Sequence, residues 1–153
     1  IQQTSGDFEG QKLAVASLSL THTSGDIEID GLEAGGLSLT SVSGDIEVEN
    51  SNILSDCTLH STSGELSLSD MQIGGRLTCG STSGDIEAER ISLAEASLSS
   101  TSGDIHATIL GTSADHRVEA KTTSGRIRIP ENGNGARTIQ VETTSGNISV
   151  YFR

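Results

Sequence analysis

The chain has 153 residues, of which a third are apolar, with no Trp, one Tyr and two Phe. Its formal net charge is -12, and residues 1–110 hold 17 acidic against 3 basic side chains, while 111–153 hold 4 against 6. An acidic surface argues against a nucleic-acid partner, because phosphate binding requires basic side chains. No apolar run approaches the ~20 residues that a membrane span requires.

A Thr-Ser-Gly-Asp motif, or a close variant of it, recurs along the whole chain. A nearly constant period of this length is typical of a solenoid built from stacked coils. We therefore predict a single domain, 1–153, with one coil beginning near each motif serine. These serines are Ser5, Ser24, Ser43, Ser63, Ser83, Ser102, Ser124 and Ser145.

The second repeat shows the elements of one coil in chain order. Alternating apolar residues predict strands around 27–29 and 37–39, with a shorter apolar segment at 32–34 between them. The same columns recur in later repeats, so equivalent strands pair in parallel about 4.8 Å apart. The predicted fold is an all-β, single-stranded parallel β-solenoid (β-helix). We expect about seven to eight coils of ~20 residues, each with two to three short strands.

The Ser-Gly step of each repeat predicts a corner of the coil. Glycine suits a backbone conformation that is costly for other residues. We expect the serines to point inward and to bond to the backbone or to each other. A nucleophile has no use for eight copies, so the motif is interpreted as corner chemistry rather than as a catalytic site.

The residue after each glycine forms an acidic column, Asp7, Asp26, Asp45, Glu65, Asp85 and Asp104, followed by Arg126 and Asn147. Carboxylates are hard oxygen ligands, so Asp7, Asp26, Asp45, Asp85 and Asp104 are candidate calcium ligands. The nine-residue period and paired glycines of calcium β-rolls are missing, however. We therefore favour hydrogen bonding at the corner plus solubility, and predict no cofactor.

Outward hydroxyl side chains precede each Ser-Gly step and predict a second surface. The candidate ligand residues are Thr23, Thr62, Thr82, Thr101, Thr21 and Thr40. A flat hydroxyl lattice suits a glycan or, in principle, ice, although His60 and Gly80 break the regularity that an ice plane needs. Threonine is also simply a favourable exposed strand residue.

The remaining reactive side chains give no metal or catalytic pattern. Cys57 and Cys79 fall on inward columns but are offset by two residues, so we predict two buried free thiols. The four histidines lie in different columns and are expected at the surface: His22, His60, His106 and His116. We expect Tyr151 and Phe152 to cap the C-terminal end of the solenoid or to contact a partner.

The unit Thr-Ser-Gly-Asp-Ile-Glu, at 23–28 and 82–87, resembles the bacterial DUF4097 family of proposed adhesins and the related toast-rack domains of envelope-stress proteins. The resemblance covers essentially the whole chain and implies an exported protein of the bacterial cell envelope or surface. It supplies no catalytic residues. The chain opens with Ile1 directly before the first repeat, as expected of a mature or trimmed segment.

Three functions remain open from the sequence. The first is a non-enzymatic envelope module, an adhesin or binding protein that presents its side-chain ladders to a glycan or protein partner. The second is a structural scaffold that assembles end to end through unpaired strand edges. The third, a carbohydrate-active enzyme, has the least support, because the irregular stretches 108–117 and 130–136 carry no clustered catalytic set.

Overall fold

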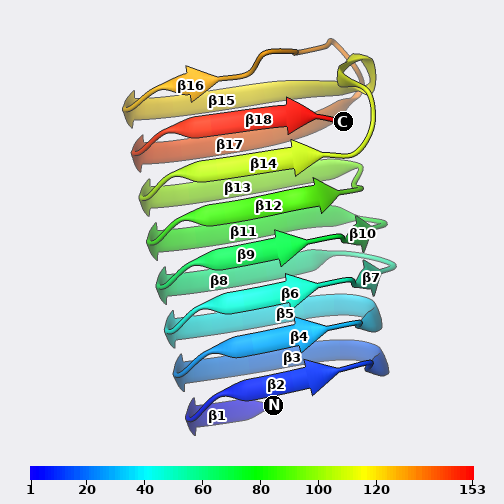
Figure 1. Cartoon of the computed structure of the whole chain (residues 1–153), viewed down its shortest axis with the longest axis vertical. Helices are drawn as coiled ribbons and strands as arrows, with labels where there is room; N and C mark the ends of the chain where they lie inside the picture. The colour runs from blue at the N-terminus through cyan, green and yellow to red at the C-terminus, as the bar shows by residue number, and fades with distance from the viewer.

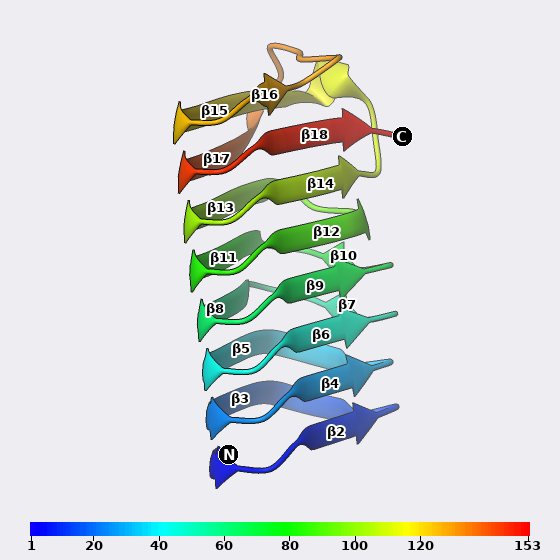
Figure 2. The ribbon, with the colours of Figure 1, turned by 60° about the vertical axis from the view of Figure 1, so that its left-hand side comes forward.

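Parallel strands from successive coils form two sheets that face each other in the computed structural model, which describes residues 1–153 (Figures 1 and 2). The predicted all-β parallel solenoid is therefore confirmed. No helix in the structure has the length and apolarity needed to cross a bilayer.

Sheet A contains the strands that precede each Ser-Gly corner. Its main path runs β1-β3-β5-β8-β11-β13-β17-β15, and the short strands β7 and β10 pair beside it. Its strands are β1 (Gln2–Ser5), β3 (Ala14–Ser24), β5 (Glu33–Ser43), β7 (Asn52–Ile53), β8 (Cys57–Ser63), β10 (Gln72–Ile73), β11 (Arg76–Ser83), β13 (Glu95–Ser102), β15 (His116–Ser124) and β17 (Arg137–Ser145).

Sheet B contains the strands that follow each corner, in the order β16-β18-β14-β12-β9-β6-β4-β2. One 3-10 helix, η1 (Ser113–Asp115), lies before β15. The strands of sheet B are β2 (Phe8–Gln11), β4 (Ile27–Asp30), β6 (Ile46–Glu49), β9 (Leu66–Ser69), β12 (Ile86–Ile91), β14 (Ile105–Ile109), β16 (Ile127–Arg128) and β18 (Ile148–Phe152).

A narrow aliphatic core fills the space between the two sheets. Alternate residues point inward along each strand, as Ile27 and Ile29 of β4 do, and both are fully buried. The core cluster contains 33 buried residues, with Phe8 and Phe152 only partly buried against it. Because the two sheets lie close together, the space between them is shallow. Leu, Ile, Val and Ala therefore fill this core without large aromatic anchors.

The last two coils are stacked in the reverse of chain order. β17 lies between β13 and β15, and β18 lies between β14 and β16 (Figure 1). The chain therefore runs to the outermost position first, and its final coil inserts behind it. This corrects the prediction that the columns follow chain order. It also places Tyr151 and Phe152 on the inserted strand β18, so they do not cap the end.

Glycine is required at each corner because the coils approach closely there. Gly44 has a φ of +124°, and a Cβ on it would lie 2.0 Å from the carbonyl oxygen of Gly25. The same close approach recurs from coil to coil, for example at Gly64, where the corresponding distance to Gly44 is 2.2 Å. No residue that carries a Cβ fits such a position without strain.

The motif serines are all exposed, which corrects the prediction that they point inward. The backbone turns at the serine, so strand alternation ends one step earlier than expected. The last inward position is two residues before each serine, and it forms a buried polar column along the stack. Its buried members are His22, Ser41, Ser61, Ser81, Ser100 and Thr143. Where partners are made, they are corner carbonyls: the Thr143 hydroxyl donates to the Gly103 oxygen at 3.2 Å.

The cysteines and histidines occupy different environments. Cys57 and Cys79 are free and buried, as predicted, and burial raises the pKa of Cys57 to about 12. The surface prediction is wrong for His22, which lies in the buried polar column, and for His116, whose ring packs 5.4 Å from that of Phe152. The sequence placed all four in separate columns but did not show that these two columns point inward.

Candidate binding surfaces

The outer face of sheet A carries the predicted hydroxyl surface. Threonines directly before the motif serines form one exposed column, which continues through the inserted coil and is interrupted at Val42: Thr4, Thr23, Val42, Thr62, Thr82, Thr101, Thr144 and Thr123. Thr21 and Thr40 lie side by side in a neighbouring column of the same face. All six predicted ligand residues therefore lie on the outer face of sheet A.

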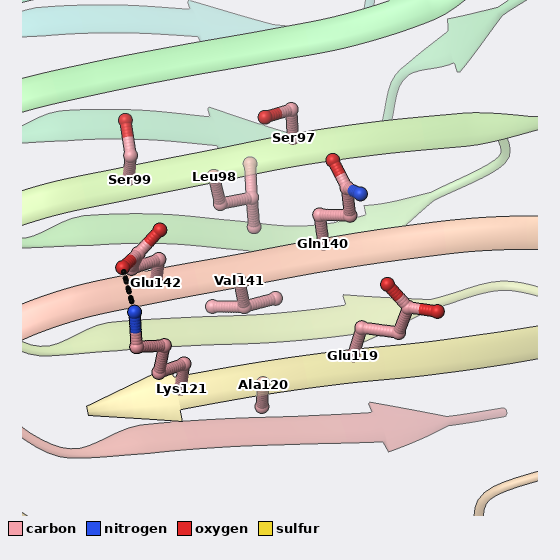
Figure 3. Close-up of a pocket in the computed structure, with 9 residues that line it drawn as sticks. All are labelled: Ser97, Leu98, Ser99, Glu119, Ala120, Lys121, Gln140, Val141 and Glu142. Carbon is pink, nitrogen blue, oxygen red and sulfur yellow. Dashed lines mark ion pairs between the residues drawn. The ribbon is translucent and has the colours of Figure 1, made fainter.

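A shallow hollow of about 380 Å³ lies on this face near the end of the solenoid that β15 and β16 form, here called the outer end (Figure 3). It forms where the short Ser97 and Ser99 of β13 adjoin the longer Gln140 and Glu142 of β17. Glu119, Ala120 and Lys121 of β15 complete the far side, and the floor follows the backbone of Leu98 and Val141, whose side chains are buried.

One ion pair spans the hollow at its edge. The Lys121 ammonium lies 3.2 Å from a carboxylate oxygen of Glu142, and both side chains are mostly exposed (Figure 3). An exposed pair of this kind contributes little to stability. Its charges, with the Glu119 carboxylate and the Gln140 amide, offer donors and acceptors to a polar ligand beside the Ser97 and Ser99 hydroxyls.

Sequence reasoning missed this hollow. It placed the last coils in chain order, so β15 rather than β17 was expected beside β13. A signal was present, since hydroxyl residues at these outward positions give way to charged and amide side chains after Ser99. The change in residue type indicated a different surface, but not which strands would build it.

The acidic column is a ladder of hydrogen bonds to the backbone. The Asp carboxylates each accept the backbone N–H of the equivalent residue in the next coil, as Asp7 accepts from Asp26 at 3.1 Å and Asp26 from Asp45 at 2.9 Å, whereas Glu65 makes no such bond to Asp85. The ladder continues through the inserted coil, where Asp104 accepts from Asn147 at 2.7 Å and Asn147 from Arg126 at 3.1 Å. Corner bonding thus accounts for the Asp residues.

The calcium candidates therefore each have at least one carboxylate oxygen engaged by the protein, and Asp104 has both. Asp45 accepts from Glu65 at 2.8 Å and Asp85 from Asp104 at 2.7 Å, like the members already described. No group of three or more His, Cys, Asp or Glu side chains is arranged to hold a metal ion. A calcium role stays a prediction, and comparing the melting temperature with and without calcium tests it.

The outer face of sheet B is strongly acidic over most of its length and basic at the outer end. One column reads Glu9, Glu28, Glu47, Ser67, Glu87, His106, Ser149 and Arg128 in spatial order. Partial burial, followed by repulsion from Glu49 and Glu28, raises the pKa of Glu47. Partial burial, then repulsion from Glu87, raises the pKa of Glu65. This face thus concentrates like charge that a cationic surface would relieve.

The comparisons with known proteins identify the fold family. The family model described as Toastrack DUF4097 matches residues 1–151. Neither curated proteins nor solved structures give a match. Because the family model covers nearly the whole chain, the protein belongs to the Toastrack DUF4097 family.

Proposed function

We propose that this chain is a non-enzymatic binding module of the bacterial cell envelope, and that the outer face of sheet A contacts a glycan or protein partner. One observation carries the proposal. Apart from Val42, the exposed threonine column continues from coil to coil, including the coil that is inserted out of chain order. Stability of an exposed strand does not require this uniformity across an insertion, whereas a continuous contact surface does.

The geometry of this face suits an extended partner. Neighbouring rungs repeat about every 4.8 Å, and each rung offers hydroxyl donors and acceptors on a flat surface. A single rung binds weakly, but a polymeric partner that contacts several rungs gains affinity through effective concentration. The hollow beside Gln140 and Glu142 adds a concave polar end to the surface.

Matched substitutions on the two faces test this proposal. Thr62 and Ser67 belong to the same coil, and they lie on the outer faces of sheets A and B respectively. The purified chain is applied to a glycan array and to extracts of envelope proteins, together with Thr62→Lys and Ser67→Lys. Loss of binding in Thr62→Lys and retention in Ser67→Lys supports sheet A as the contact face. Equal binding by both variants, or no binding by the parent chain, contradicts it.

The end-to-end scaffold is the alternative, since exposed strand edges recruit further strands. The outer end bears a feature that opposes it. The Asn132 side-chain amide accepts the Val118 N–H at 2.9 Å and donates to the Val118 carbonyl at 3.1 Å, so it occupies the edge of β15 as a next strand would. Light scattering over a range of concentrations distinguishes the two functions. Concentration-dependent growth of the particle supports the scaffold, and a constant monomer mass supports the binding module.

A further inference from the structure

Two of the three aromatic residues lie next to each other on β18, beside a second hollow on the outer face of sheet B. Its volume is about 320 Å³, near the lower end of the range for small-molecule sites. It opens where β12, β14 and β18 end, and it is lined by Glu89, Arg90, His106, Thr108, Tyr151, Phe152 and Arg153.

An aromatic wall bounds one side of this hollow. Tyr151 pairs in register with Thr108, and its ring lies 5.5 Å from that of His106 with an interplanar angle of 43°. Tyr151 is only partly buried, so part of it remains open to a ligand, while its cross-strand neighbour Thr108 is 7% exposed. An aromatic ring fixed in this way offers apolar contact area together with a polar tip.

Two arginines supply the polar side. The Arg90 guanidinium is held by Asp70, with Nε 2.7 Å from a carboxylate oxygen, and by Glu89 at 3.1 Å. Because both carboxylates engage Arg90, its charge is already paired and the charge of Glu89 is offset. Arg153 makes no ion pair, so its guanidinium is the cation that remains open for an anionic group.

We propose that this hollow binds a saccharide that carries a carboxylate, such as a uronic acid. The sugar ring lies against Tyr151, its carboxylate meets Arg153, and its hydroxyls bond to Glu89 and Arg90. Over most of sheet B the acidic columns repel an anionic ligand, whereas this hollow brings together an aromatic ring and a guanidinium that makes no ion pair. The inference rests on the proposed function in taking a glycan as partner, but it names a different face and a defined site.

The protein contains its own reporter for this site. Tyr151 is the only Tyr and the chain has no Trp, so the tyrosine fluorescence comes from the wall of the hollow. The full 153-residue chain is titrated with glucuronate and, in parallel, with glucose. We expect a saturable fluorescence change with glucuronate that weakens in added salt, and a much smaller change with glucose. No saturable change with glucuronate overturns the inference.

Ligand-observed NMR then compares three variants, since it does not depend on the tyrosine signal. Tyr151→Ser removes the wall and is expected to raise the Kd for glucuronate about tenfold. Arg153→Gln is expected to raise it severalfold and to abolish the salt dependence. Tyr151→Phe keeps the ring, is the matched control, and should bind within about threefold of the parent. Unchanged binding in Arg153→Gln overturns the inference even if Tyr151→Ser fails to fold.

The outcomes separate this site from the proposed function. If glycan binding is lost in Thr62→Lys but unaffected by Tyr151→Ser and Arg153→Gln, sheet A is the contact face and the hollow inference is wrong. If glucuronate binding depends on Arg153 while Thr62→Lys retains all partner binding, the hollow stands and the proposal for sheet A is wrong. A chain that binds no saccharide by either method overturns the hollow, and the protein-extract arm alone then decides the proposed function.

Discussion

Engineered disulfides on the outer face of sheet A test the reversed order of the last two coils. Ser99 pairs in register with Glu142, and Glu142 pairs on its other side with Lys121. Neighbouring strands are about 4.8 Å apart, so Ser99 and Glu142 are one spacing apart and Ser99 and Lys121 two, roughly 9.6 Å. A disulfide needs Cα atoms about 4.4–6.8 Å apart. We therefore expect Ser99→Cys/Glu142→Cys to form a bond and Ser99→Cys/Lys121→Cys to form none.

All three positions are exposed, so the substitutions should leave the core intact. Each variant is oxidised under native conditions, and the intramolecular bond is detected by gel mobility and by mass spectrometry of the digested protein. The parent chain is the control, because its Cys57 and Cys79 thiols are buried and burial raises the pKa of both. A bond in Ser99→Cys/Lys121→Cys and none in the other pair refutes the insertion, and with it the hollow shown in Figure 3.

Three further predictions concern stability. Gly64→Ala should lower the free energy of unfolding by about 3 kcal/mol in urea titrations. The φ of Gly64 is +142°, and the new Cβ would lie 2.2 Å from a backbone oxygen. Gly36→Ala is the control and should change the free energy little, because its nearest contact is at 3.7 Å. Asp45→Ala should lower the free energy of unfolding by about 1–2 kcal/mol, because the acceptor for the next coil is lost. Asp45→Asn keeps an acceptor and should lower the free energy of unfolding by less in the same titrations. The raised pKa values of Glu47 and Glu65 mean that the folded state is favoured when these two carboxyls are protonated. The stabilisation from protonation is fully present below pH 4.5 and is lost as pH rises through the folded-state pKa values. Thermal scans at low salt should therefore give a higher melting temperature near pH 5 than at pH 7, and a flat or opposite trend contradicts a raised pKa from burial and repulsion at these two carboxyls.

Much of the fold could be predicted from the sequence because each coil repeats the same local rules. Alternation at positions such as Ile27 and Ile29 identifies both sheets, and the recurring glycine identifies each corner. The offset of Cys57 and Cys79 was enough to predict two free thiols, which the structure confirms. Local periodicity does not show at which residue the backbone turns, so the prediction that the motif serines point inward was wrong.

The order of the last coils depends on the energies of competing stacks, which no local pattern expresses. The final coil offers Ile139, Val141, Ile148 and Val150, and all four are buried between neighbours. The coil before it offers Val118, Ala120, Ile127 and Ile129 at equivalent positions, so the last coil is the more apolar through Val141 in place of Ala120, and Ile127 on the outermost coil remains 45% exposed. Placing the more apolar coil inside removes more apolar area from water, which favours the insertion.

The same insertion explains why the acidic column loses its charge in two steps. In spatial order the column ends Asp104, Asn147, Arg126. Asp104 and Asn147 each have a coil above them, and the side-chain oxygen of each accepts the N–H of the equivalent residue in that coil, Asn147 and Arg126 respectively. Arg126 lies on the outermost coil, where the chain itself supplies no further N–H, so an acceptor is unnecessary and a cation is tolerated. In chain order the sequence Asp, Arg, Asn has no such rationale, because Arg126 would then leave the N–H of Asn147 without an acceptor.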